Sequence, residues 1–514
     1  MSSVLTNDII YEILKLLKDT EIYENSLYSC LYINRRWCRL TVPFLWKITF
    51  QKETKSEIFI TTYISCLNRR YRDWLDDDGC SMLHSKGLLN LPTLFEYETF
   101  LKEISFKSLN KAVNHWFDCV YDSDVQKKVS FTRRLEFHLL KMFAEQSILE
   151  SIAIELEIEN CWNIFKLRIS NIKSLSLSFP PMKDNEFLNK VKKFLCDLKN
   201  TFQQLDEVCF FVDESSDNND LIYQSSREII SFVQSQKNLK GFNLIGGEDK
   251  FLSAKEIISS TLKFHAGSLM HLNIDNVTFN GMPFNYFEKC PNLESLGMGF
   301  CMGLVITDPD SKFKNLKKLE LSLNKFSPQI TASILKKAGE YLIELDIDDV
   351  RNEITDVLVT YCSKIEILSI SGKAKLNLPW LSNLKNLKRL EFMRVTELCN
   401  ELEPSEMSVL SSNFKIKKII TELFVPDEFD CFYRNTQNLD FSLISVIFSP
   451  EVKNLENIKY EDPDSSLEIN ISSPGSTQSS DDMDYKHITL RKKRSEDSNN
   501  LLSFRYLIDK LQYC

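Results

Sequence analysis

The sequence predicts an α/β fold in which an N-terminal helical module precedes a curved solenoid of short parallel strands and a disordered tail. Three observations predict it. Apolar residues recur at helical spacing over the first residues, and an apolar-x-x-apolar-x-apolar pattern then repeats along the middle of the chain. Near the end the composition shifts to Ser, Asp, Pro and Asn. We therefore divide the 514 residues into segments 1–48, 49–148, 149–460, 461–500 and 501–514.

The first segment predicts two or three short helices. Asn7 or Asp8 can cap the first helix, because a short polar side chain accepts hydrogen bonds from the free N–H groups of the first turn. The apolar positions of this helix lie at Ile9, Ile13, Leu16 and Leu17. A second apolar set follows the polar break at 18–21 and ends at Pro43.

This ordered set resembles the F-box, a helical module that docks on the Skp-family adaptor of SCF-type cullin-RING ubiquitin ligases. The matching residues are Leu5, Asp8, Ile9, Glu12, Ile13, Arg35, Arg36, Trp37, Leu45 and Trp46, and Thr6 stands where the family has Pro. The resemblance implies adaptor docking through Leu5, Ile9, Ile13, Leu16, Trp37, Leu45 and Trp46. Through the adaptor it implies cullin and RING partners. The alternative is a small helical cap that shields the end of a larger core and needs no partner.

The segment 49–148 predicts an irregular helical neck. Apolar residues lie three and four apart in 100–104 and 134–142. The acidic run 76–78 lacks the alternating ligands and the distal Glu of a calcium loop, so we interpret it as a solvated loop. In the F-box interpretation the neck fixes the angle between the adaptor and the recognition domain.

The repeats occupy 149–460 and are clearest over 269–395. Their first positions are Leu149, Ile172, Leu205, Leu239, Leu269, Leu293, Leu316, Leu342, Ile365 and Leu387. From Leu269 onward, subtracting consecutive first positions gives intervals of 24, 23, 26, 23 and 22 residues, which is typical of leucine-rich repeats. Each unit predicts a strand with one apolar face, and stacked units bury that face in a shared parallel sheet.

Several cysteines of these units stand where a cysteine-containing subtype of the repeat has them, at Cys290, Cys301 and Cys362. The resemblance is to the subtype that is often joined to an F-box. The ninth position of a unit usually holds Asn or Cys, and Cys301 and Asn324 fit. Three other units have Val there, at Val277, Val350 and Val395. Backbone stacking in those turns must therefore be satisfied in another way.

The register also predicts which residues face the concave side of the sheet. The candidate substrate-binding residues are Lys318, Glu320, Glu344, Asp346, Asp348, Arg389 and Glu391. Because the strand with Glu344, Asp346 and Asp348 is fully acidic on this face, one hypothesis is that it contacts a basic segment of a recruited protein. The alternative is a solvated strand face.

Composition excludes several classes of function. The formal net charge is 63 minus 72, or -9, which disfavours non-specific binding to nucleic acid or to an anionic membrane surface. The sequence contains no apolar run of about 18 residues, the length that a membrane-spanning helix needs. Its N-terminus is unlike a signal peptide. We expect a soluble protein of the cytoplasm, with the nucleus as the alternative. The fourteen cysteines include no C-x-x-C pair, so we expect them to be reduced and mostly buried.

Catalytic and metal-binding motifs are also missing from the sequence. The six histidines show neither an H-E-x-x-H motif nor a cysteine partner at ligand spacing, and there is neither a Walker motif nor a nucleophile elbow. The glycines at 297–303 only loosely echo a phosphate loop, and the repeat register explains them. We therefore expect no metal, no cofactor and no catalytic residue.

The C-terminal segments are the least regular. Residues 461–500 cannot bury enough apolar area to order themselves and predict a disordered tail, and 501–514 predict a short helix. The basic run Arg491–Arg494 is interpreted as a solvated charge run, with a nuclear import signal as the alternative.

Together these features predict the substrate-recognition subunit of an SCF-type ligase, in which the repeats hold an unknown protein target. The first alternative is a leucine-rich-repeat interaction scaffold with no role in ubiquitin transfer. A nuclear RNA or chromatin factor, suggested by the basic run, is disfavoured by the acidic net charge.

Overall fold

The computed structural model divides the chain into two compact units, Met1–Leu239 and Lys240–Cys514, which are described separately. The structure describes residues 6–18, 23–47, 50, 56–71, 74, 83–84, 86–88, 92–121, 125–157, 169, 171–181, 184–212, 219–247, 254–308, 311–348, 351–371, 378–393, 419–423, 443–448, 467–472 and 486–492. Leu5, the acidic run 76–78 and the expected helix at 501–514 lie outside these residues.

The first unit begins with a three-helix module of α1 (Asn7–Lys18), α2 (Tyr23–Leu31) and α3 (Arg35–Leu45). Its core consists of Ile10, Leu14, Leu27 and Cys30, against which Leu17, Trp37, Leu40, Phe44 and Leu45 pack. Asn34 caps α3, because its side-chain oxygen accepts the N–H groups of Arg36 and Trp37 at 2.9 and 3.1 Å. At the start of α1 the hydroxyl of Thr6, rather than Asn7 or Asp8, accepts an N–H group of the first turn.

A helical region follows the module, as the sequence predicts for the neck. It comprises α4 (Ser56–Arg70), the 3-10 turn η2 (Tyr97–Thr99), α6 (Phe106–Val120) and α7 (Val125–Gln146). Large aromatic side chains fill its interior, among them the fully buried Tyr63, Trp116 and Phe143. The indole N–H of Trp116 donates to the hydroxyl of Thr61 at 3.0 Å, which fixes the register of α6 against α4.

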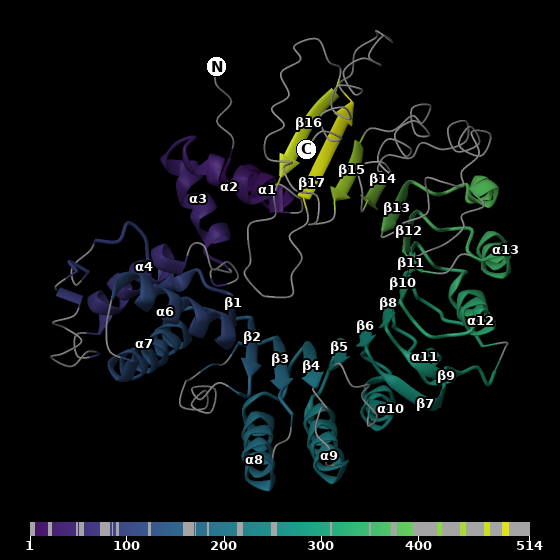
Figure 1. The fold of residues 1–514 in the computed structure, drawn as a ribbon, viewed down its shortest axis with the longest axis horizontal. Coiled ribbons are helices and arrows are strands. Elements are labelled where there is room, and N and C mark those ends of the chain that lie inside the picture. Colours follow the sequence, from purple (N-terminus) through teal and green to yellow (C-terminus); the bar gives the residue numbers. More distant parts are fainter. Residues whose placement is uncertain are drawn as a thin grey trace. The chain divides into compact units, whose positions relative to one another are not determined.

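Parallel strands complete the first unit. They are β1 (Glu103–Ser105), β2 (Ser151–Glu155), β3 (Ser174–Phe179) and β4 (Glu207–Val212), paired in chain order. Buried and partly exposed residues alternate along β2 and β3, as expected for strands with one face in a core. Helices α8 (Asn185–Thr201) and α9 (Asn219–Ser235) lie on one side of these strands (Figure 1). The short strand β1, inside the expected neck, was not predicted.

The second unit continues the pattern with a parallel sheet in the order β5-β6-β8-β10-β11-β12-β13. The strands span Gly241–Gly246, His271–Asp275, Ser295–Gly299, Lys318–Ser322, Glu344–Ile347, Ile367–Ser371 and Arg389–Met393. On their outer side lie α10 (Ala254–His265), α11 (Asn285–Glu288), α12 (Pro328–Ala338), α13 (Asn352–Tyr361) and the 3-10 turn η4 (Leu378–Asn383) (Figure 1). Two further strands, β7 (Thr278–Pro283) and β9 (Met302–Val305), form a separate parallel pair.

Every predicted first position is followed two residues later by the first residue of a strand, from Leu149 and β2 to Leu387 and β13. The predicted register is therefore confirmed, including the units upstream of residue 269 where the spacing is irregular. Central leucines of neighbouring strands stand side by side in the core, as Leu296, Leu319 and Leu345 do. This arrangement of short parallel strands, with one inward leucine row and helices on the outer side, defines a leucine-rich-repeat solenoid.

The turns that follow the strands are held by side-chain amides. The Asn324 amide donates to the carbonyl oxygen of Met298 at 2.7 Å, and its oxygen accepts the N–H of Cys301 at 2.7 Å. The thiol of Cys301 in turn donates to the carbonyl oxygen of Ile274 at 3.5 Å. Polar side chains therefore link the turns of successive units, which satisfies backbone groups that the strands leave unpaired.

The turn with Val277 at its ninth position uses the residue before it. The amide of Asn276 donates to the carbonyl oxygen of Gly246 at 3.4 Å, so this turn is also linked to the preceding unit. Further along, the carboxylate of Asp348 accepts the N–H of Leu323. The other two valines, Val350 and Val395, lie outside the described residues.

Two described strands lie within 461–500, which was expected to be disordered, and two more lie between 419 and 448, in the segment that was expected to hold repeats. Strands β14 (Ile419–Leu423), β15 (Leu443–Phe448), β16 (Leu467–Ser472) and β17 (Lys486–Lys492) form a sheet in the order β14-β15-β17-β16. The pairs of β17 with β15 and β16 are antiparallel. Local alternation of apolar and polar residues in β16 favours a strand despite the polar composition of the whole segment.

Candidate interaction surfaces

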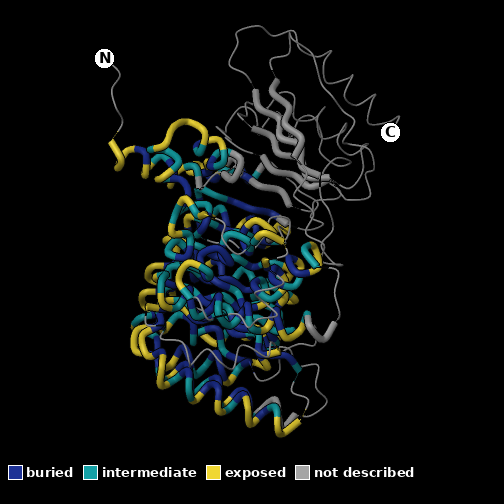
Figure 2. Tube along the Cα trace, turned by 90° about the vertical axis from the view of Figure 1, so that its left-hand side faces the viewer, coloured by how far each residue is buried: buried dark blue, intermediate teal, exposed yellow. Residues whose placement is uncertain are grey.

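The first candidate surface is an apolar stripe on α1. Ile10, Leu14 and Leu17 face the module core. Each of them is preceded by another apolar residue, and these residues, Ile9, Ile13 and Leu16, form a neighbouring stripe about 100° away around the helix. We call Ile9, Ile13 and Leu16 the outer stripe. Ile9 and Leu16 are 47% and 68% exposed, and Figure 2 shows the N-terminal helices with extended exposed segments. The outer stripe is therefore apolar surface that the module itself does not cover.

Further apolar side chains are exposed at the end of α2, where Tyr32 and Ile33 lie. Tyr11 is also exposed but is engaged on both sides, because its ring lies 5.1 Å from that of Phe44 and the ammonium group of Lys15 lies 4.8 Å from its centroid. The module thus exposes apolar groups on α1 and in the turn directly after α2. Contiguous exposed apolar surface is characteristic of binding sites on soluble proteins.

The F-box resemblance implied seven docking residues, and in the structure they lie in different environments. Ile9, Ile13 and Leu16 form the outer stripe, while Trp37 and Leu45 pack against the module core. Leu5 lies outside the described residues. Trp46 is the exception, because its side chain leaves the module for the helical region.

Trp46 is 9% exposed and lies among aromatic residues of that region. Its ring centroid is 4.8 Å from Phe59, 5.3 Å from Tyr63 and 4.2 Å from Tyr97. The carbonyl oxygen of the next residue, Lys47, accepts the N–H of Lys102 at 3.0 Å. Trp46 therefore anchors the end of α3 to the helical region and is not available to a partner.

The second candidate surface is the concave face of the repeat sheet in the second unit. Lys318 of β10 stands opposite Glu344 of β11, and Glu320 stands opposite Asp346. The ammonium group of Lys318 lies 2.6 Å from a carboxylate oxygen of Glu344. The pKa of Lys318 is raised, first because Glu344 accepts this hydrogen bond. These side chains are partly exposed, as predicted for the outward face.

Several acidic groups of this face are occupied by contacts within the sheet. Glu344 is paired with Lys318, and Asp348 accepts the backbone N–H of Leu323 in a turn. Arg389, the first residue of β13, is partly buried, whereas the side chain of Glu391 in the same strand is outside the described part of the structure. The predicted substrate-binding residues therefore share one face, but part of their charge is neutralised internally.

The neighbouring strand β8 has glycines at two outward positions, Gly297 and Gly299. A Cβ atom at Gly297 would collide with the side-chain oxygen of Asn273, and one at Gly299 would lie 2.6 Å from a carboxylate oxygen of Asp275. Side chains of β6 therefore lie over β8 and fill the space above the glycines. Burial raises the pKa of Asp275. Close packing between strands, and not a phosphate loop, explains these glycines.

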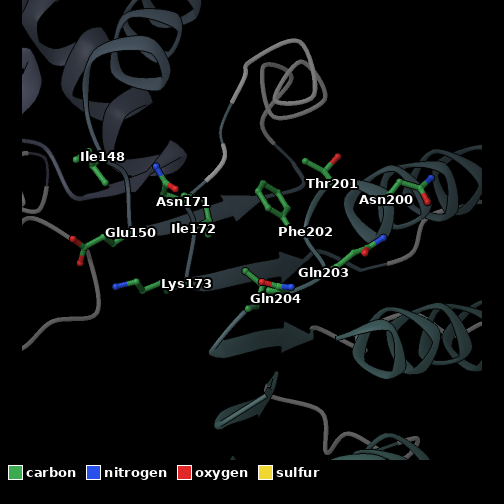
Figure 3. Close-up of a pocket in the computed structure, with 11 residues that line it drawn as sticks. Ile148, Glu150, Asn171, Ile172, Lys173, Asn200, Thr201, Phe202, Gln203 and Gln204 are labelled. Atoms are coloured by element: carbon green, nitrogen blue, oxygen red, sulfur yellow. The ribbon is translucent and has the colours of Figure 1, made fainter. Parts of the chain in front are cut away.

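An open pocket of about 740 Å³ lies in the first unit, where β2, β3 and β4 begin and α8 ends (Figure 3). Its rim carries Glu150 and Lys173 from the starts of adjacent strands, together with the amides of Asn171, Asn200 and Gln203. The eleven described residues that line it include neither histidine nor cysteine.

One group of side chains was not predicted from the sequence. Glu57, His115 and Cys119 lie together on α4 and α6, with all ligand atoms within 4.8 Å of one another. The spacing of His115 and Cys119, four residues apart in one helix, was the signal that could have found two of them. Glu57 could not be found in this way, because it comes from another helix.

Comparison with known proteins gives structural similarities only. No family model matches the chain, and no curated protein matches it in sequence. The leucine-rich-repeat protein LegL7 from Legionella pneumophila is 12% identical and covers 58% of this chain and 90% of its own, with a TM-score of 0.34. The mouse RP105/MD-1 complex is 15% identical over 59% of this chain and 50% of its own, with a TM-score of 0.30.

An internalin, InlF, from Listeria monocytogenes is 13% identical, covers 59% of this chain and 81% of its own, and has a TM-score of 0.26. Similarities with TM-scores this low carry no argument about function. The leucine-rich-repeat architecture is defined by the chain's own strand register and turns. Within the described part of the chain, no helix combines the length and apolar character that crossing a membrane requires.

Proposed function

We propose that this chain is the substrate-recognition subunit of an SCF-type cullin-RING ubiquitin ligase. In this proposal the three-helix module docks on a Skp-family adaptor and the repeats hold a target protein. The observation that carries the proposal is the outer stripe of Ile9, Ile13 and Leu16, which the module leaves outside its own core. The F-box resemblance of the same residues supplies the identity of the partner.

The outer stripe is unnecessary for folding of the module. α1 already buries Ile10 and Leu14 completely, so a polar residue at Ile9 or Leu16 would be compatible with a folded module. A second apolar stripe beside the first widens the apolar face of α1, which is typical of a helix that packs against two partners. The inner stripe packs against α2 and α3, and we propose that the outer stripe packs against the adaptor.

The proposed mechanism is proximity, and it requires no catalytic residue in this chain. Bound to the adaptor, the module would connect the repeats to the cullin and RING subunits, which bring a charged ubiquitin-conjugating enzyme. Holding the target on the same assembly raises the effective concentration of its lysines near the ubiquitin thioester. The target would contact the concave face of the repeats.

A repeat scaffold without a role in ubiquitin transfer is the second candidate, and the burial of Trp46 favours it. A tryptophan packed among Phe59, Tyr63 and Tyr97 is what a helical cap on a larger core would show. The two candidates differ in what they predict for the outer stripe. A cap has no partner there, whereas an adaptor-docking module requires one.

Calorimetric titration of the full chain with a purified Skp-family adaptor separates the two candidates. We expect binding at micromolar concentration or tighter, and a loss of about 1–2 kcal/mol for Leu16→Ala, because burying a leucine contributes roughly 1.5–3 kcal/mol and part of this side chain is already covered. Ile9→Ala should behave in the same way. The matched control is Ile58→Ala on α4, which truncates a residue that is 65% exposed outside the module.

The control variant should bind as the unaltered chain does. A folded full chain that binds no adaptor would leave the scaffold as the remaining candidate. Equal binding by Leu16→Ala, Ile9→Ala and the unaltered chain would show that any docking site lies elsewhere.

A further inference from the structure

The cluster of Glu57, His115 and Cys119 provides nitrogen, sulfur and oxygen donors within one small region of the first unit. The Cys119 sulfur lies 3.8 Å from Nε2 and 3.9 Å from Nδ1 of His115. In a tetrahedral zinc site, bond lengths of about 2.3 Å to sulfur and about 2.0–2.1 Å to nitrogen place these two donor atoms about 3.5 Å apart. The observed separation is thus close to the distance that a shared metal ion requires.

The helices that carry the cluster are fixed relative to each other. His115 and Cys119 lie one turn apart on the same face of α6, and Glu57 is in the first turn of α4. The hydrogen bond from Trp116 to Thr61 joins residues directly adjacent to the cluster, since Trp116 follows His115 and Thr61 lies one turn after Glu57. The donor atoms are therefore positioned by a buried contact and not by flexible loops.

The donor atoms of the cluster come from two helices. Glu57 offers a carboxylate oxygen from α4, and His115 and Cys119 offer a ring nitrogen and a sulfur from α6, all within 4.8 Å of one another. All three side chains are exposed, so the ion can enter from solvent and keep an open fourth position.

We propose that Glu57, His115 and Cys119 bind a divalent transition-metal ion of the zinc class, which links α4 to α6 on the surface of the first unit. The mixed donor set selects this class, because imidazole and thiolate suit zinc whereas calcium and magnesium prefer oxygen ligands alone. On binding, the thiol proton passes to solvent and the thiolate sulfur bonds to the metal. The site is independent of the proposed adaptor-docking surface.

Cobalt(II) is the probe for the test, because a thiolate bound to this ion gives a near-ultraviolet charge-transfer absorption. The full chain, freed of metal and kept in a reductant without thiols, is titrated with cobalt(II) and then with zinc(II). We expect an absorption band that saturates at one equivalent and disappears on addition of zinc. Cys119→Ser and His115→Ala should lose the band.

The matched control is Cys196→Ser, which removes the other exposed cysteine in the described part of the chain. This variant should keep the band, whereas Glu57→Ala should weaken zinc binding by about tenfold or more, the least that loss of an outer-shell partner costs at known sites. Because the three side chains are exposed, the variants should fold. The proposal is overturned if the unaltered chain shows no thiolate band or if Cys119→Ser retains it.

Discussion

Replacing Asn324 by Ala tests the account of the repeat turns. The Asn324 side chain makes two hydrogen bonds of 2.7 Å, one to the carbonyl oxygen of Met298 and one from the N–H of Cys301. Alanine removes both partners but keeps the backbone. The substitution therefore leaves one donor and one acceptor of a partly buried turn without their protein partners.

The expected loss of unfolding free energy follows from the cost of leaving these two backbone groups without their hydrogen bonds. An unmade hydrogen bond at a buried group costs about 1–3 kcal/mol, and Asn324 is only partly buried, so water can replace some of the loss. We expect the second unit to lose about 2–4 kcal/mol of unfolding free energy. The loss should be local, because no partner of Asn324 in these bonds lies in the first unit.

Amide hydrogen exchange resolved by peptide is the appropriate assay, because a chain with two units need not unfold in one step. Peptides that span Met298 to Asn324 should exchange faster in Asn324→Ala, while peptides of the first unit should be unchanged. Lys325→Ala is the control, since this exposed neighbour contributes its backbone N–H to the turn and alanine keeps that group. Equal exchange in the two variants would refute the role assigned to Asn324.

Three further substitutions test other parts of the structure. Glu98 is fully buried between two arginines. Burial alone would raise the pKa of Glu98, but hydrogen bonds from Arg70, the Cys66 thiol, its own backbone and Arg69 together lower it. Glu98→Gln should therefore cost about 2–4 kcal/mol near neutral pH. Because the pKa of Glu98 is lower in the folded state than the unfolded value of about 4.5, its ionised form stabilises the folded chain above that pH. The difference in unfolding free energy between Glu98→Gln and the unaltered chain should therefore shrink when denaturation is measured at lower pH. Gly297→Val should lower the melting temperature of the second unit through collision with Asn273, and Asn273→Ala in the same chain should restore part of it. Lys318→Met should change unfolding free energy by less than about 1 kcal/mol in chemical denaturation, because its pair with Glu344 is partly exposed.

The strands of the repeat domain were predictable from sequence because one pattern specifies both their position and their buried face. Leu293 and Leu316 are the first positions of two units, and the strands of these units begin two residues later, at Ser295 and Lys318. The linking of the turns was only partly predictable. Asn324 occupies the ninth position of its unit, as expected, and links two turns. Asn276 links its turn to the preceding unit from the eighth position, one residue earlier than expected.

Features that depend on distant residues could not be predicted. The burial of Trp46 requires Phe59 and Tyr97, which approach it only after the helical region has folded. The grouping of Glu57 with His115 likewise depends on how α4 packs against α6. In both cases periodicity indicates an amphipathic helix but not which neighbour it meets.

The difference at 461–500 has another cause. Composition averaged over the whole segment is polar, and such averages predict disorder. β16 and β17 are only short parts of it, and they pair with each other, while β17 also pairs with β15 outside the segment. A short strand within a polar segment therefore escapes a prediction based on average composition.

The central claim is that the outer stripe of α1 is an adaptor-docking surface. Its most direct test is amide hydrogen exchange of the full chain with and without a purified Skp-family adaptor. We predict slower exchange in peptides that span α1 and the end of α2, and little change in peptides of the repeat sheet. Unchanged exchange across the three-helix module of a folded chain, at saturating adaptor, would contradict the claim.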